Sequence, residues 1–204
     1  MFIDEAGFYL LPGLVRTYAP RGETPVLSSF QTYDHLSIMS GVTMGGKLYT
    51  LVRDTALTSL ESVVFLKHVR RETKSKLLMI WDGSPIHRRE VTTFMQNGGA
   101  SHIHLEQLPP YAPELNPDEG VWEQLKNVEM RNLSCKDLNH LRIELNLTIN
   151  RLRSKPRLIQ AFFAGAKLSI KVKLLMQQSV SLTLSLYPPV KSCQAQPTDF
   201  KTFI

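Results

Sequence analysis

Three acidic residues lie far apart in the sequence, and each adjoins a predicted structural element. Asp4 follows a short apolar pair at the start of the chain, and Asp82 follows the apolar run 77–81. Glu119 opens a predicted helix after a proline-rich loop. Carboxylates are hard oxygen ligands that suit Mg²⁺ or Mn²⁺, and two such ions can promote attack at a phosphodiester. The three acids therefore form a candidate catalytic and metal-binding set.

Each acid also has a simpler explanation. Asp4 can be a solvent-facing residue of a frayed terminus. Asp82 precedes Gly83-Ser84-Pro85, and aspartate is a common turn residue. Glu119 can simply favour the positive end of a helix. Residue type and position alone leave both explanations open.

The surrounding pattern predicts a sheet that brings these positions together. Alternating and continuous apolar runs predict strands ending at Asp4 and covering 16–22, 36–42, 47–52, 76–81 and 103–108. Helical spacing predicts helices from residue 59 and over 89–96, 118–130 and 136–152, the last with Leu138, Leu141, Leu145, Leu147 and Ile149 on its apolar face. This order of elements predicts an α/β fold with a central mixed β-sheet flanked by helices.

Four longer segments carry a family resemblance. They are FIDEAGF at 2–8, RTYAPRGETPVL at 16–27, LLMIWDGSPIHR at 77–88 and LPPYAPELNPDEGVWEQLK at 108–126. Together with residues 150–163, they resemble the DDE transposases of the mariner-related superfamily, specifically the bacterial insertion-sequence branch. The resemblance implies a ribonuclease H-like fold in which Asp4, Asp82 and Glu119 hold two Mg²⁺ or Mn²⁺ ions. It also implies hydrolysis and strand transfer at DNA phosphodiesters during transposition.

Other residues near the acids are expected to support this chemistry. Basic side chains supply most DNA affinity through the phosphates, and the candidates are Arg16, Arg21, His87, Arg88 and Lys126. A solvated helix start explains His87 and Arg88 equally well. Three residues are expected to give structural support: Asn116 as a helix N-cap, Pro117 beside it, and Trp122 in core packing. Strand alternation should point Glu5 away from Asp4.

The composition agrees with a DNA-binding protein but does not require one. The 204 residues carry a formal charge of +6, which also fits a solvated basic surface. The two cysteines suggest neither a disulfide framework nor a zinc site, and no segment resembles a signal peptide or a membrane span. We expect a cytoplasmic bacterial protein that associates with the nucleoid when bound to DNA, and no membrane partner.

The resemblance ends near residue 170, so we expect a catalytic domain over 1–170, slightly truncated at its N-terminus, and an atypical tail over 171–204. The tail is expected to be poorly ordered, although the alternation at 179–187 also suits a strand. Family members usually carry a helix-turn-helix region before the catalytic domain, and Gly83 stands where related sequences often have Asn.

These departures leave two functions open. In the first, the chain is an active endonuclease domain that acts on transposon ends and target DNA. It would act as a homodimer or with a partner chain that supplies the helix-turn-helix. In the second, the chain is a non-enzymatic remnant that binds DNA weakly or pairs with a full-length transposase.

Overall fold

The computed structural model describes residues 1–11, 13, 16, 18–22, 26, 33–82, 88–110, 112–166 and 168, without the side chain of Arg88. The chain divides into two units, Met1–Lys167 and Leu168–Ile204, and the account below concerns the first. The predicted tail, including the strand at 179–187, lies outside the described residues. The proposed boundary at residue 170 therefore stays a prediction.

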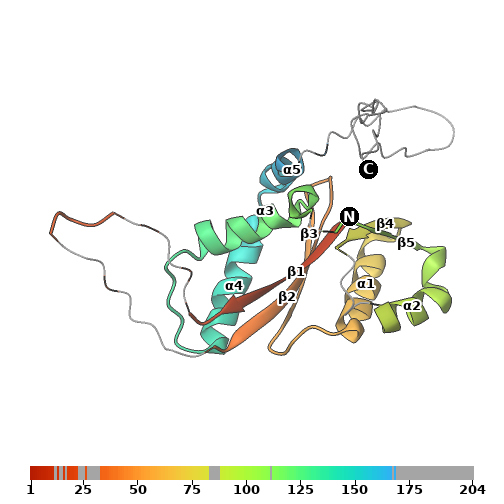
Figure 1. Cartoon of the computed structure of the whole chain (residues 1–204), viewed down its shortest axis with the longest axis horizontal. Coiled ribbons are helices and arrows are strands. Elements are labelled where there is room, and N and C mark those ends of the chain that lie inside the picture. Colours follow the sequence, from red (N-terminus) through yellow and green to blue (C-terminus); the bar gives the residue numbers. More distant parts are fainter. Residues whose placement is uncertain are drawn as a thin grey trace, which may run out of the picture. The chain divides into compact units, whose positions relative to one another are not determined.

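Five strands form one mixed sheet in the order β3-β2-β1-β4-β5 (Figure 1). They are β1 (Phe2–Tyr9), β2 (His35–Val42), β3 (Leu48–Arg53), β4 (Leu77–Trp81) and β5 (Ile103–Gln107). The strand β2 pairs antiparallel with both β1 and β3, whereas β4 pairs parallel with β1 and β5. The first strand therefore occupies the centre of the sheet.

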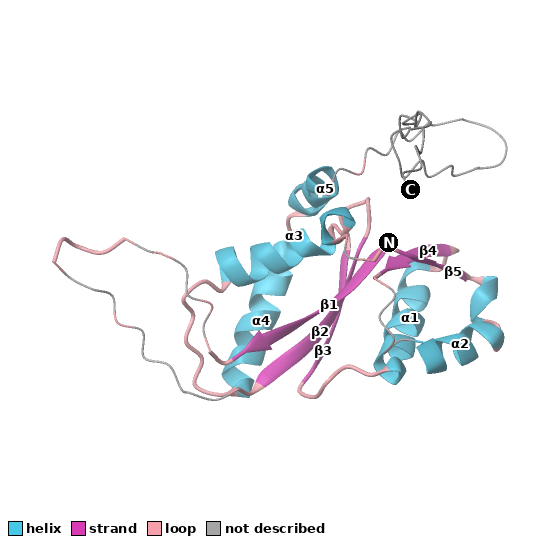
Figure 2. Ribbon diagram, in the orientation of Figure 1, coloured by secondary structure: helices cyan, strands magenta, loops and turns pink. Residues whose placement is uncertain are grey.

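Helices cover both faces of this sheet. Figure 2 shows α1 (Ser59–Thr73) and α2 (Arg88–Gln96) on one side, with α3 (Asp118–Glu123) and α4 (Leu138–Arg153) on the other. The helix α5 (Pro156–Gly165) packs on α3 and α4. Short 3₁₀ turns occur at Gly99–Ser101 and Pro113–Leu115, and the π-helical segment η4 (Gln124–Glu129) continues α3. No helix among the described residues is long and apolar enough to cross a membrane.

The alternation of side chains along β1 divides the core into two layers. Ile3 belongs to the cluster under α1, together with Met39, Phe65 and Met79. Phe2 and Phe8 face the other layer, where their rings meet those of Phe163 and Trp122. Asp4 has the same parity as Phe2 and Phe8, and this places it on the face that α3 covers.

The predicted α/β class with a mixed sheet and flanking helices is confirmed, and most element predictions are correct within two residues. The first strand was wrongly ended at Asp4. It continues to Tyr9 because every residue from Phe2 to Tyr9 pairs with β2, although Asp, Glu and Gly are poor strand formers.

Three further predictions need correction. Residues 16 and 18–22 are not in a strand. The predicted helix 118–130 is α-helical only to Glu123 and then widens into η4. Leu147 of α4 is exposed, whereas Thr148 and Leu152 are buried.

The helix α5 was not predicted as an element. It begins at Pro156, directly after the end of α4, and proline is well suited to the first turn of a new helix.

Candidate active site

The positions of Asp4 and Asp82 follow from two neighbouring strands of the sheet. The parallel strands β1 and β4 pair Phe2 with Ile80. Asp4 comes two residues after Phe2, and Asp82 comes two residues after Ile80, just beyond the end of β4. Asp82 follows β4 immediately and is exposed, whereas Asp4 lies within β1 and is partly buried.

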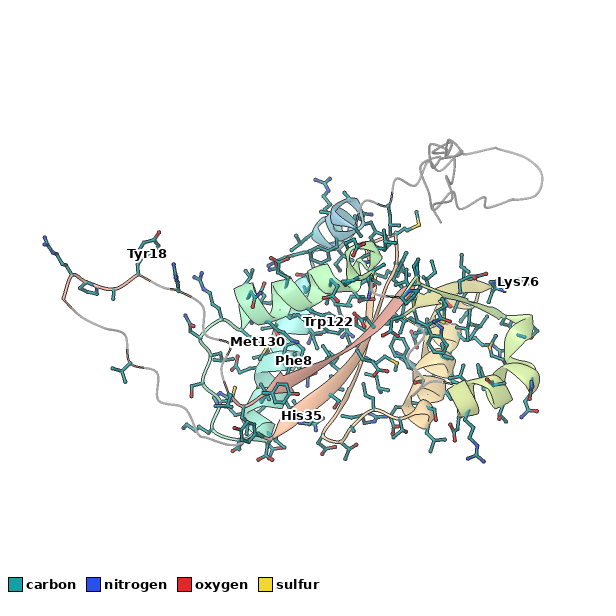
Figure 3. The ribbon with its side chains drawn as sticks, in the orientation of Figure 1. Phe8, Tyr18, His35, Lys76, Trp122 and Met130 are labelled. Carbon is teal, nitrogen blue, oxygen red and sulfur yellow. The ribbon has the colours of Figure 1, made fainter. Side chains whose placement is uncertain are left out.

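Hydrogen bonds tie the helix that carries Glu119 to Asp4. Asn116, just before α3, donates from Nδ2 to Asp4 Oδ2 at 2.9 Å, and Trp122 of α3 donates from Nε1 to the same oxygen at 3.0 Å. Figure 3 shows Trp122 and Phe8 together between α3 and β1. The centroids of their rings are 6.3 Å apart. Glu119 is in the first turn of α3 and is exposed.

Burial and the charges of the two other acids act on Asp4. Burial raises the pKa of Asp4 to about 6, against the hydrogen bonds from Trp122 and from the backbone of Glu5. The negative charges of Glu119 and Asp82 add to this rise. Asp82 and Glu119 therefore lie near enough to Asp4 for their charges to act on it, and the catalytic role of the three acids stays a prediction.

Two acidic residues outside the predicted set belong to the same region. Burial and the charges of Asp82 and Asp4 raise the pKa of Glu5 to about 7. Asp118 is fully buried and accepts a hydrogen bond from Ser40 Oγ of β2, and burial raises its pKa well above the ordinary value. The sequence signal for both was only adjacency to a candidate ligand.

One cation reaches this acidic region from η4. Lys126 is half-buried, and its Nζ lies 5.2 Å from the centre of the Phe8 ring. Burial lowers the pKa of Lys126, while the charges of Glu119 and Asp4 oppose that change. The π-helical widening of η4, a geometry often found at functional sites, carries this side chain. A cavity of about 640 Å³ between α3, η4 and α5 is lined by both Glu119 and Lys126.

The other predicted site residues are less closely grouped. Arg16 and Arg21 are exposed outside any helix or strand, and Arg88 begins α2. His87 lies outside the described residues. None of these four predicted DNA contacts is tested by the structure.

Two predicted supporting residues make contacts beyond their predicted roles. Pro117, whose backbone is already helical, bounds α3. Just before it, Asn116 Oδ1 accepts from Asp118 N at 3.2 Å, as an N-cap side chain does, while Asn116 Nδ2 donates to Asp4 Oδ2 at 2.9 Å. Trp122 is buried as expected for a packing residue, but it also donates to Asp4. Nothing in the spacing of these residues indicated either contact with β1.

The donor set fits a divalent cation in its chemistry and charge. Carboxylate oxygens are the usual ligands of Mg²⁺ and Mn²⁺. A cation would offset the burial and the smaller charge repulsion that raise the pKa of Asp4. Among the described residues, however, no group of three His, Cys, Asp or Glu side chains is close enough to hold an ion. Binding through all three predicted ligands therefore requires a change in side-chain position.

Comparison with known proteins agrees with this fold. A crystal structure of the Mos1 mariner paired end complex with Mn has a TM-score of 0.59 at 12% identity, covering 82% of this chain and 53% of that chain. The corresponding Mos1 complex with Mg has a TM-score of 0.57 at 12% identity, with 81% and 52% covered. A structure of the Mos1 transposase catalytic domain and Raltegravir with Mn has a TM-score of 0.51 at 10% identity, with 82% and 80% covered.

These likenesses confirm the ribonuclease H-like fold, and the chain spans about half the length of the first Mos1 chains that it matches. None of the curated proteins matches the sequence. The family model described as DDE superfamily endonuclease matches residues 1–142. Because that match covers more than half of the 204 residues, the chain belongs to the DDE superfamily endonuclease family.

Proposed function

We propose that this chain is the catalytic domain of a metal-dependent DNA endonuclease and transposase, which hydrolyses phosphodiesters and transfers strands in DNA transposition. One observation carries the proposal: Asp4 is hydrogen-bonded to both Asn116 and Trp122, which flank Glu119, and Asp82 follows the neighbouring strand β4. Family membership supports the same reading.

In this proposal Asp4, Asp82 and Glu119 hold two divalent ions, Mg²⁺ or Mn²⁺, the metals named for two of the Mos1 complexes. When bound, the ions stabilise the charge that develops at phosphorus during attack by water or a 3′-hydroxyl. The half-buried Lys126 binds a backbone phosphate beside the acids. Arg16, Arg21, His87 and Arg88 hold the flanking DNA strand through its phosphates.

The proposed substrates are transposon ends and target DNA. Some Mos1 neighbours are named as a paired end complex and a strand transfer complex, and both names imply assembly on DNA. We propose that the chain acts on DNA as a homodimer or with a partner chain that supplies the helix-turn-helix region. A bacterial insertion-sequence origin and a cytoplasmic location remain part of this proposal.

A second candidate is a non-enzymatic transposase remnant that binds DNA weakly or pairs with a full-length transposase. The observation in its favour is that no metal-holding trio is assembled among the described side chains. It predicts DNA binding without cleavage.

Cleavage of supercoiled plasmid DNA, with and without Mg²⁺ or Mn²⁺, separates the two candidates. We expect metal-dependent nicking by the wild-type chain and a loss of at least 100-fold in Asp82→Asn, on the order of the loss expected when a charge-stabilising group is removed. Glu123→Gln, which alters an exposed acid of α3, is the matched control and should remain active. Equal nicking by wild type and Asp82→Asn, or none in either, would favour the remnant.

A further inference from the structure

The carboxylate of Asp4 has most of its hydrogen-bonding capacity already in use. An ionised carboxylate offers about four acceptor positions, two on each oxygen. Oδ2 accepts from Asn116 Nδ2 at 2.9 Å and from Trp122 Nε1 at 3.0 Å. Oδ1 accepts from the backbone N–H of Glu5 at 2.8 Å. One acceptor position, on Oδ1, remains for a further partner.

Both side-chain donors are themselves held firmly. Asn116 is only 5% exposed, and its Oδ1 accepts from the backbone N–H of Asp118 at 3.2 Å, so its amide orientation is determined. Trp122 is also 5% exposed, and its ring packs edge-on against Phe8. In the sequence, one of the two donors lies before Glu119 and the other after it.

We infer that Trp122 and Asn116 are positioning residues that fix the orientation of the Asp4 carboxylate, which would be one ligand of a divalent cation. The inference rests on the proposed function for the cation, and on the hydrogen-bond geometry for the positioning. It assigns to Trp122 a role beyond core packing.

Mn²⁺ binding followed by electron paramagnetic resonance tests the inference without any turnover. Groups that orient a metal ligand commonly contribute 10- to 100-fold to metal affinity. We therefore expect the Kd for Mn²⁺ to rise about 10-fold or more in Trp122→Phe, which keeps an aromatic ring but lacks the indole N–H, and similarly in Asn116→Ala.

Val121→Ala is the matched control, because Val121 is fully buried on the same helix and gives no hydrogen bond to Asp4 from its side chain. It should lower thermal stability and leave the Kd unchanged. An unchanged Kd in Trp122→Phe and Asn116→Ala, or a change no larger than that in Val121→Ala, would overturn the inference. If Trp122→Phe fails to fold, Asn116→Ala decides the matter.

A metal-free signal separates this inference from the proposed function. The chain has two tryptophans, so its NMR spectrum holds two indole N–H signals. Asp4→Asn should shift the Trp122 signal strongly upfield because a charged acceptor is lost. If the wild-type chain binds no Mn²⁺, the proposed function fails, and the indole shift still decides the positioning. An unshifted Trp122 signal would show that Trp122 does not hold Asp4.

Discussion

At the scale of single residues, buried polar pairs connect the helix α3 to the strands beneath it. Asp4 of β1 and Ser40 of β2 are directly paired in the sheet. Asp4 accepts a hydrogen bond from Asn116, just before α3, and Ser40 donates one to Asp118, the first residue of α3. Ser40 and Asp118 are both fully buried. A buried acceptor that loses its donor is costly, so these contacts constrain where α3 can dock.

Ser40→Ala should lower the free energy of unfolding by about 1–3 kcal/mol, because Asp118 then loses its donor in a buried site. The double variant Ser40→Ala/Asp118→Val removes both polar partners and should recover most of that loss. Urea denaturation of the two variants measures the difference. A double variant as unstable as the sum of its single changes would mean that the hydrogen bond is not the source of the effect.

A second residue-scale prediction concerns Glu129. Partial burial raises its pKa, but hydrogen bonds from Lys155 and Arg151 outweigh this, so the pKa lies below its ordinary value. A lowered pKa stabilises the fold above the unfolded-state pKa, and that stability is lost as the pH falls. Glu129→Gln should therefore cost about 0.5–1 kcal/mol at pH 7. That cost should shrink as the pH falls from about 4.3, the ordinary pKa of glutamate, through the lowered pKa of Glu129.

Chemical denaturation at several pH values follows this difference. Glu123→Gln, at an exposed acid of α3, is the control and should show no such pH-dependent loss. A deficit in Glu129→Gln that does not shrink as the pH falls below about 4.3 would contradict the assignment.

At the scale of elements, the contact between α3 and α5 depends on a missing side chain. A Cβ at Gly120 would lie 2.7 Å from both Cγ and Cδ1 of Phe162, closer than real Cβ contacts allow. Glycine therefore permits the close approach of these two helices. The residue adjoins Glu119, so the packing of α5 bears on the position of the proposed ligand.

Gly120→Ala should destabilise the chain by about 1–3 kcal/mol through overpacking. Shortening the opposing side chain in Gly120→Ala/Phe162→Ala should give a favourable coupling of about 0.5–3 kcal/mol in a double-mutant cycle. Gly165→Ala on α5 is the control, since among the described residues no atom outside the adjoining backbone of its own helix lies within 4 Å of its added Cβ. Equal losses in Gly120→Ala and Gly165→Ala would remove the steric explanation.

At the scale of the whole molecule, a folded-state metal site links cation binding to stability. The three candidate ligands come from a central strand, the end of its neighbour and a helix on one face. Only the folded chain brings them together, so a cation that binds them must favour folding.

Mg²⁺ or Mn²⁺ should therefore raise the Tm, with about 2.7 kcal/mol of stabilisation at a concentration 100 times the Kd. Differential scanning calorimetry with and without metal measures this shift. Asp82→Asn should abolish it, and an unchanged shift in that variant would place the ion elsewhere.

The extent of the folded unit gives a second prediction at this scale. We expect deletion of residues 171–204 to change the free energy of unfolding by no more than about 0.5 kcal/mol, as for changes away from packed features. Urea denaturation of the shortened chain checks this. A loss of several kcal/mol would show that residues 179–187 form an integral strand and that the boundary near 170 is wrong.

The sequence by itself determined the class of fold and the identity of the candidate ligands. Long apolar runs such as 77–81 and the helical spacing from residue 59 are local signals, because side-chain periodicity follows directly from backbone geometry. The same local signals identify Asp4 and Asp82 as candidate ligands, because each follows a predicted strand. The resemblance then assigned Asp4, Asp82 and Glu119 to one set.

Only the tertiary structure decided how those acids are held. The extent of β1 depends on pairing with β2, which overrides the poor strand propensity of Asp4, Glu5 and Gly7. The hydrogen bonds from Asn116 and Trp122 to Asp4 join residues more than 110 positions apart in the chain. Contacts of this kind depend on how a helix docks on a sheet, and no local pattern in the sequence encodes that docking.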